Sequence, residues 1–202
     1  MIENFVDIII KPKETTTKIL KKDLSWGKIF IIILILVGFN LIFSLINSYI
    51  IFGSIPVMIL NLIMGIPSSI VVLFVSFFLF HISSIILGGK GKFRRLCSVL
   101  SFVYIIGVFG SILGLIQVIF LRTEFAAIAE TRKMMDLSNP VYITFGILGV
   151  LLSAVLSYYA HYAIKENYNF TKARALVAAY IPFVLGIMYT AIILFISSRL
   201  VF

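Results

Sequence analysis

A long stretch without charge constrains this chain more than any other feature of its sequence. Between Lys28 and Lys90 there are 61 consecutive residues without Asp, Glu, Lys or Arg. Shorter uncharged runs follow at 96–121, 137–164 and 175–198. A soluble helix or strand needs a polar face, whereas an unpaired charge at the centre of a bilayer costs at least about 2.5–3.5 kcal/mol. The sequence therefore predicts an integral membrane protein.

The uncharged runs are long enough to form helices that cross a bilayer. A spanning helix needs about 20 apolar residues, and a transmembrane barrel would need short strands of alternating polarity. The runs are continuously apolar, and 12% of the chain is charged, against roughly 25% in soluble domains. We expect an all-α, polytopic integral membrane helical bundle with five transmembrane helices, at about 29–51, 67–87, 96–121, 140–163 and 175–198.

The basic residues indicate an orientation for these five spans. Of the 17 Lys and Arg residues, six precede the first span and none lies between the first and second spans. With the N-terminus inside, thirteen lie inside and four outside. Because cytoplasmic loops carry an excess of Lys and Arg, the N-terminus is expected in the cytoplasm and the C-terminus outside. Anionic lipid headgroups at the cytoplasmic face account for the net charge of +9, so we expect no nucleic-acid partner.

Three segments flank or connect the spans. Residues 1–28 are expected to form a cytoplasmic interfacial segment, broken at Pro12 and ending near Trp26, and residues 29–202 the membrane domain. Residues 52–66 are too short to span and indicate a re-entrant or interfacial piece, with Pro67 in the first turn of the second span. The loop at 122–139 is expected to extend the third span as an amphipathic helix.

Small residues recur along the predicted spans at helical spacing. Helices in lipid associate by close packing of such residues. We expect packing at these positions: Gly110 and Gly114 in the third span, Gly149, Ser153 and Ser157 in the fourth, and Pro182 and Gly186 in the fifth. The Gly110 and Gly114 pair could pack inside the protomer or between copies. Pro182 should also free the carbonyl of Ala178 for another partner.

Six polar side chains fall within or beside the predicted spans: Asn40, Asn47, Asn61, His81, Gln117 and His161. They could form a polar path with a pair of histidines near its inner end. They could equally make ordinary hydrogen bonds between helices, worth about 0.6 kcal/mol each. Ion-coupled transporters usually place a charged residue inside the membrane. No predicted span contains one, which favours ordinary hydrogen bonds.

The sequence does not supply the residues that the considered enzyme classes require. An intramembrane aspartyl protease needs two carboxylates within spans, and none is there. His81 stands two and three residues from Ser83 and Ser84, which is poor geometry for a base and its nucleophile. Two histidines and the single Cys97 supply too few ligands for zinc and exclude an intramolecular disulfide. We expect no enzyme, no cofactor and no metal.

Three short stretches resemble a known family. They are the apolar segment, proline and basic helix at 5–20, the run L-G-G-K-G-K-F at 87–93, and the run N-F-T-K-A-R-A at 169–175. With five spans, they make the chain similar to the Yip domain family of Ypt/Rab-interacting membrane proteins, and to its short prokaryotic members in particular. Family members often carry a proline early in the third span, whereas residues 101–108 have none. Eukaryotic members also have a long cytoplasmic N-terminal domain, and with the first span expected from residue 29 we expect no such domain here.

The resemblance implies a small non-enzymatic protein, expected in a prokaryotic cell membrane, that organises membrane or recruits partners. Its cytoplasmic face would bind anionic lipid headgroups or a protein partner through these residues: Lys90, Lys92, Phe93, Arg94, Arg95, Lys172 and Arg174. These cations could instead do no more than set the topology. A homo-oligomer stays open, and the alternative function is a channel or carrier for a small neutral solute.

Overall fold

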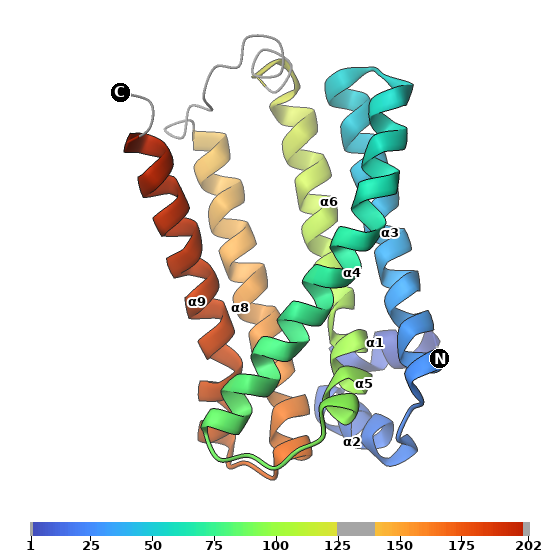
Figure 1. Cartoon of the computed structure of the whole chain (residues 1–202), viewed down its shortest axis with the longest axis vertical. Helices are drawn as coiled ribbons and strands as arrows, with labels where there is room; N and C mark the ends of the chain where they lie inside the picture. The colour runs from blue at the N-terminus through green and yellow to red at the C-terminus, as the bar shows by residue number, and fades with distance from the viewer. Residues whose placement is uncertain (1, 125–139, 200–202) are drawn as a thin grey trace. The chain divides into compact units, whose positions relative to one another are not determined.

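The computed structural model describes residues 2–124 and 140–199, with side chains for 3–124 and 140–192, and it is helical with no strand in those ranges (Figure 1). The helices follow in this order: α1 (Ile2–Ile10), α2 (Pro12–Lys22), α3 (Trp26–Phe52), α4 (Ile55–Ile86), α5 (Phe93–Val103), α6 (Ile105–Phe120), α8 (Pro140–Tyr168) and α9 (Lys172–Arg199). The all-α prediction is confirmed. Most of the helical extension expected at 122–139, from residue 125 on, lies outside the described residues.

Several of these helices are long and apolar enough to cross a membrane. Four qualify singly among the described residues: α3, α4, α8 and the Lys172–Ile192 part of α9. Taken together as one broken span, α5 and α6 make a fifth. Large apolar side chains such as Val72 and Phe120 are 62% and 71% exposed, which suits a hydrocarbon surrounding. The chain is therefore a polytopic helical membrane protein.

The prediction of a separate re-entrant or interfacial segment at 52–66 is wrong. The chain turns at Gly53, which has φ of 60° and donates its N–H to the Tyr49 carbonyl at 2.9 Å. From there α4 continues as one 32-residue helix, and Pro67 lies inside it instead of in the first turn of a span. Backbone groups in lipid have no water to bond, so a helix is favoured even where proline costs it one hydrogen bond.

The third span, expected as one helix over 96–121, is interrupted at Tyr104. This residue lies between α5 and α6, and its carbonyl accepts a hydrogen bond from the N–H of Gly107 at 2.9 Å. No proline causes the break. Before it, Ser98 and Ser101 donate to carbonyls three residues back, at 2.7 and 3.2 Å. Such hydrogen bonds from serine compete with the helical backbone and favour a bend.

The chain divides into two compact units. Unit 1 comprises Met1–Leu24, Val75–Val103 and Ala154–Phe202, and unit 2 comprises Ser25–Phe74 and Tyr104–Ser153. In unit 2, α3 packs along α6, and the buried side chains of α3 include Ile33 and Val37. The division into an interfacial segment at 1–28 and a membrane domain at 29–202 stays a prediction.

The core of unit 1 is built around α5, whose residues 96–103 are all buried. Both N-terminal helices pack against it, and Pro12 separates them as the sequence predicts. The rings of Phe5 on α1 and Phe102 on α5 lie 4.9 Å apart. The Tyr159 hydroxyl donates to the Ile9 carbonyl at 2.9 Å. The N-terminal helices are therefore integral parts of this unit.

Candidate functional site at two connecting loops

The loop after α4 begins with a left-handed glycine. Gly88 has φ of 81°, and its N–H bonds the Ile85 carbonyl at 2.8 Å. The N–H of Gly89 reaches back to the Ser84 carbonyl at 2.9 Å. This pair of bonds is the Schellman ending that the two glycines predict, and it satisfies carbonyls that the helix leaves unpaired. The predicted end of the second span, at about residue 87, agrees with the observed end of α4 at Ile86.

The loop after α8 is built in a similar way, with asparagine in place of glycine. Asn169 has φ of 53°, and the N–H of Phe170 bonds the Lys165 carbonyl at 3.0 Å. Thr171 then starts α9, because its hydroxyl accepts a hydrogen bond from the N–H of Arg174 at 3.4 Å. The run N-F-T-K-A-R-A therefore encodes the end of one helix, a buried Phe170 and the start of the next helix.

The two loops touch at a position where glycine is required. A Cβ added to Gly91 would lie 2.6 Å from Tyr168 Cδ1 and 2.7 Å from the backbone oxygen of Asn167. A Cβ added to Gly89 would lie 2.6 Å from the same Tyr168 atom and 2.8 Å from Phe170. The Asn167 amide closes the contact by donating to the Lys92 carbonyl at 3.0 Å. We call this arrangement, of residues 87–92 with 167–171, the loop contact.

Further bonds hold the helices that carry the loop contact. His81 on α4 hydrogen-bonds the hydroxyl of Tyr168. The Ser83 hydroxyl donates at 2.8 Å to the carbonyl of Ala178, which Pro182 leaves without its helical partner. The sequence prediction of another partner for that carbonyl is confirmed. The sequence patterns do not single out Asn167 and Tyr168, although these residues directly precede the run at 169–175, because their partners lie far away in the chain.

Four of the predicted cations form an exposed surface on the two loops. Lys90, Lys92, Lys172 and Arg174 are all exposed, and we call this set the basic loop surface. The guanidinium of Arg174 lies 5.3 Å from the centre of the Phe170 ring, in a cation–π contact. Lys90 and Lys92 extend from backbone within the loop contact, and Lys172 directly follows it at the start of α9.

The other two predicted cations bind inside unit 1. Arg94 pairs with the Asp23 carboxylate at 2.5 Å, and Arg95 donates to the Leu20 carbonyl at 3.4 Å. Both bonds join α5 to the C-terminal end of α2, where a carbonyl is available and a cation is favourable. The ring of Phe93 lies 5.1 Å from His81 and 6.2 Å from Phe78. Phe93, Arg94 and Arg95 therefore contribute mainly to helix packing and less to an exposed binding surface.

Several of the polar residues in the spans bind to neighbouring helices. Within unit 2 the Ser111 hydroxyl donates to Asn40 at 2.6 Å, and the Asn61 amide donates to Ser48 at 2.5 Å. In unit 1, His161 instead donates to the carbonyl of Tyr158 on its own helix, α8. The remaining two, Asn47 and Gln117, are half-buried. Among the described residues, no group of three His, Cys, Asp or Glu could hold a metal ion.

The bond between Asn40 and Ser111 leads to a prediction about stability. Replacing Asn40 by leucine should lower the free energy of unfolding by about 0.6 kcal/mol, the usual size of such bonds in membranes. Chemical denaturation in mixed micelles would measure the change. In a double-mutant cycle with Ser111→Ala, the two effects should not add. Additive effects would show that the pair is not coupled.

The small residues proposed for packing are in different surroundings. A Cβ on Gly110 would meet Leu152 at 3.2 Å, and Ser157 is buried. Pro182 is half-buried, and Ser153 is exposed. For Gly114, Gly149 and Gly186, the added Cβ meets nothing within 4 Å among the described residues apart from its chain neighbours and the local backbone of its own helix. Their packing role stays a prediction.

Comparison with known proteins identifies a family. No curated protein and no solved structure matches the chain. A family model, the Yip1 domain, matches residues 6–193. The match includes the runs at 87–93 and 169–175, which form the loop contact. The chain therefore belongs to the Yip1 domain family.

Proposed function

We propose that this protein is a non-enzymatic membrane scaffold whose basic loop surface binds an acidic segment of a protein partner. The loop contact is the observation that carries the proposal. Tight glycine packing and the bond from Asn167 to Lys92 hold two loops together, and exposed cations extend from both. Cations on a fixed backbone lose less conformational entropy on binding than cations on a mobile loop.

The orientation of the chain supports the same proposal. The excess of basic residues on the predicted inner side favours a cytoplasmic N-terminus and an outer C-terminus. The resemblance to the short prokaryotic members of the family favours a prokaryotic cell membrane. The loops at 87–92 and 169–171 then face the cytoplasm. A surface of exposed cations there attracts acidic partners and raises their rate of association.

Photo-crosslinking in native membranes tests this function. The probe belongs at Lys172, which is exposed, and not at Phe93, whose ring contacts His81. A recurring protein adduct is expected. In a Lys90→Gln/Lys92→Gln background its yield should fall about tenfold, because each exposed ion pair contributes up to about 1 kcal/mol.

The matched control carries the same loss of charge on another exposed surface, in the variant Lys18→Gln/Lys22→Gln. This variant should keep the protein adduct. Lipid adducts alone, or equal loss of the protein adduct in both variants, would contradict a partner site on the basic loop surface.

A further inference from the structure

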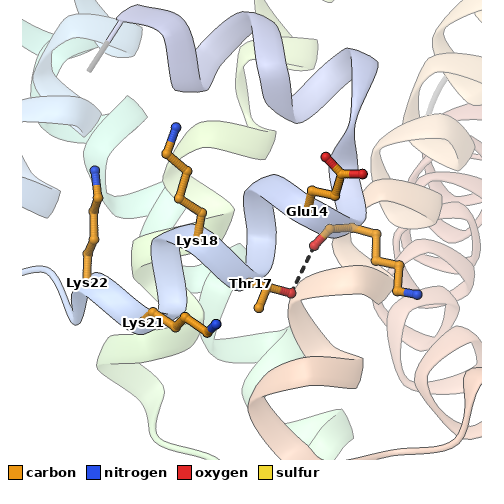
Figure 2. Close-up of a pocket in the computed structure, with 6 residues that line it drawn as sticks. Glu14, Thr17, Lys18, Lys21 and Lys22 are labelled. Atoms are coloured by element: carbon orange, nitrogen blue, oxygen red, sulfur yellow. Dashed lines mark hydrogen bonds between the residues drawn. The ribbon is translucent and has the colours of Figure 1, made fainter.

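A second set of basic residues lies on α2, a different segment from the two that carry the basic loop surface. The outer face of this helix borders an open hollow of about 670 Å³. Its lining residues repeat at helical spacing, and we call the set the lysine hollow: Lys13, Glu14, Thr17, Lys18, Lys21 and Lys22 (Figure 2). The opposite face of α2, which includes Thr16 and Ile19, is buried in unit 1. The hollow is thus presented on a fixed helix.

The charge of the lysine hollow is strongly unbalanced. It has four lysines and one carboxylate, that of Glu14. Asp23, directly after Lys22 in the sequence, already pairs with Arg94. Lys18 and Lys22 stand one turn apart and extend in the same direction from α2, as Figure 2 shows. Two neighbouring ammonium groups can bind the oxygens of one phosphate.

Exposed apolar side chains on the helix that packs against α2 indicate where the phosphate comes from. On α1, which packs against α2, Val6 and Ile10 are 54% and 67% exposed. Exposed cations on a helix that packs against a helix with exposed apolar side chains are typical of a membrane interface, where lysine stems cross the apolar layer to reach headgroups.

We propose that the lysine hollow binds the phosphate of an anionic phospholipid headgroup, while Val6 and Ile10 contact the acyl chains next to it. A soluble phosphate or an acidic peptide would make no use of these apolar side chains. The proposal needs neither the partner nor the orientation assumed for the basic loop surface.

Binding of short-chain lipids to the purified full chain in detergent tests the proposal. Native mass spectrometry would give dissociation constants for dioctanoyl phosphatidylglycerol and for dioctanoyl phosphatidylcholine. The anionic lipid should bind more tightly. Lys18→Gln/Lys22→Gln should weaken its binding at least tenfold, since a basic residue near a charged membrane surface contributes about 1 kcal/mol. Glutamine is a good helix former, so α2 should persist.

The control is Lys90→Gln/Lys92→Gln, which removes the same charge and should change lipid affinity less than twofold. Equal loss in both variants would overturn the site in favour of general electrostatics. Equally tight binding of glycerol 3-phosphate, or of a polyglutamate peptide, would assign the hollow to a soluble ligand instead. The two proposals stay distinguishable, because Lys18→Gln/Lys22→Gln should lose lipid binding and keep the protein adduct. Lys90→Gln/Lys92→Gln should lose the protein adduct and keep lipid binding.

Discussion

Replacing Gly91 by alanine is expected to lower the free energy of unfolding by about 1–3 kcal/mol, the usual cost of overpacking. The new methyl group would lie 2.7 Å from the backbone oxygen of Asn167 and 2.6 Å from the ring of Tyr168. A backbone atom cannot rotate away, so the loop contact must open or shift. The reduced entropy of the unfolded chain offsets about 0.4–1 kcal/mol of this cost. Thermal unfolding in micelles, followed by circular dichroism, measures the change.

The control for this prediction is Gly38→Ala. Gly38 lies inside α3, and an added Cβ would meet nothing within 4 Å among the described residues apart from its chain neighbours and the local backbone of α3. Alanine is favoured over glycine inside a helix by about 1 kcal/mol, so this variant should be as stable as the parent or more so. If Gly91→Ala behaved like Gly38→Ala, the close approach of the two loops would be refuted.

Replacing Phe102 by alanine is expected to open unit 1. The ring is 1% exposed and packs on Phe5, and truncating such a side chain costs about 3–5 kcal/mol. The free thiol of Cys97 on the same helix is fully buried, so it reports local opening. A membrane-permeant maleimide should label the parent slowly and the variant about a hundredfold faster, because each 1.4 kcal/mol changes the open population tenfold.

A second Phe→Ala variant serves as the control, because it removes an aromatic ring without opening the core of unit 1. Phe120 is 71% exposed, and Phe120→Ala should leave the labelling of Cys97 within a few-fold of the parent. If Phe102→Ala does not fold, Phe102→Leu is the milder variant, with a smaller increase expected in the same direction. Equal labelling rates for the Phe102 and Phe120 variants would contradict the packing of α1 on α5.

Local sequence patterns predicted the helices well and some of their ends poorly. Pro12 and Gly88 mark observed ends, and Pro140 begins α8. Gly65 and Pro67 have the same turn-forming character, yet α4 passes through both. Leu41 on α3 packs closely on Gly65, since a Cβ added to Gly65 would lie 3.1 Å from Leu41 Cδ2. A glycine needed for close packing looks the same in sequence as a glycine needed for a turn.

The candidate site was predictable in position and less so in detail. The runs at 87–93 and 169–175 point to the two loops, since they carry cations and the family resemblance. Their pairing depends on Asn167 and Tyr168, whose contacts are with Lys92 and His81. No periodic pattern links residues 75 or more positions apart. The lysine hollow was likewise visible as a basic segment, but not as the fixed outer face of a packed helix.

The sequence by itself determined the class of this protein. The hydrocarbon core of a bilayer excludes charged side chains and requires every backbone N–H and C=O to be hydrogen-bonded within the protein. Uncharged runs long enough to form a spanning helix therefore suffice to predict a helical membrane protein. Only the tertiary structure decided which cations are available. Lys90 and Lys92 are exposed, whereas Arg94 and Arg95 hold α2 against α5. That division depends on contacts between distant parts of the chain, which local composition does not encode.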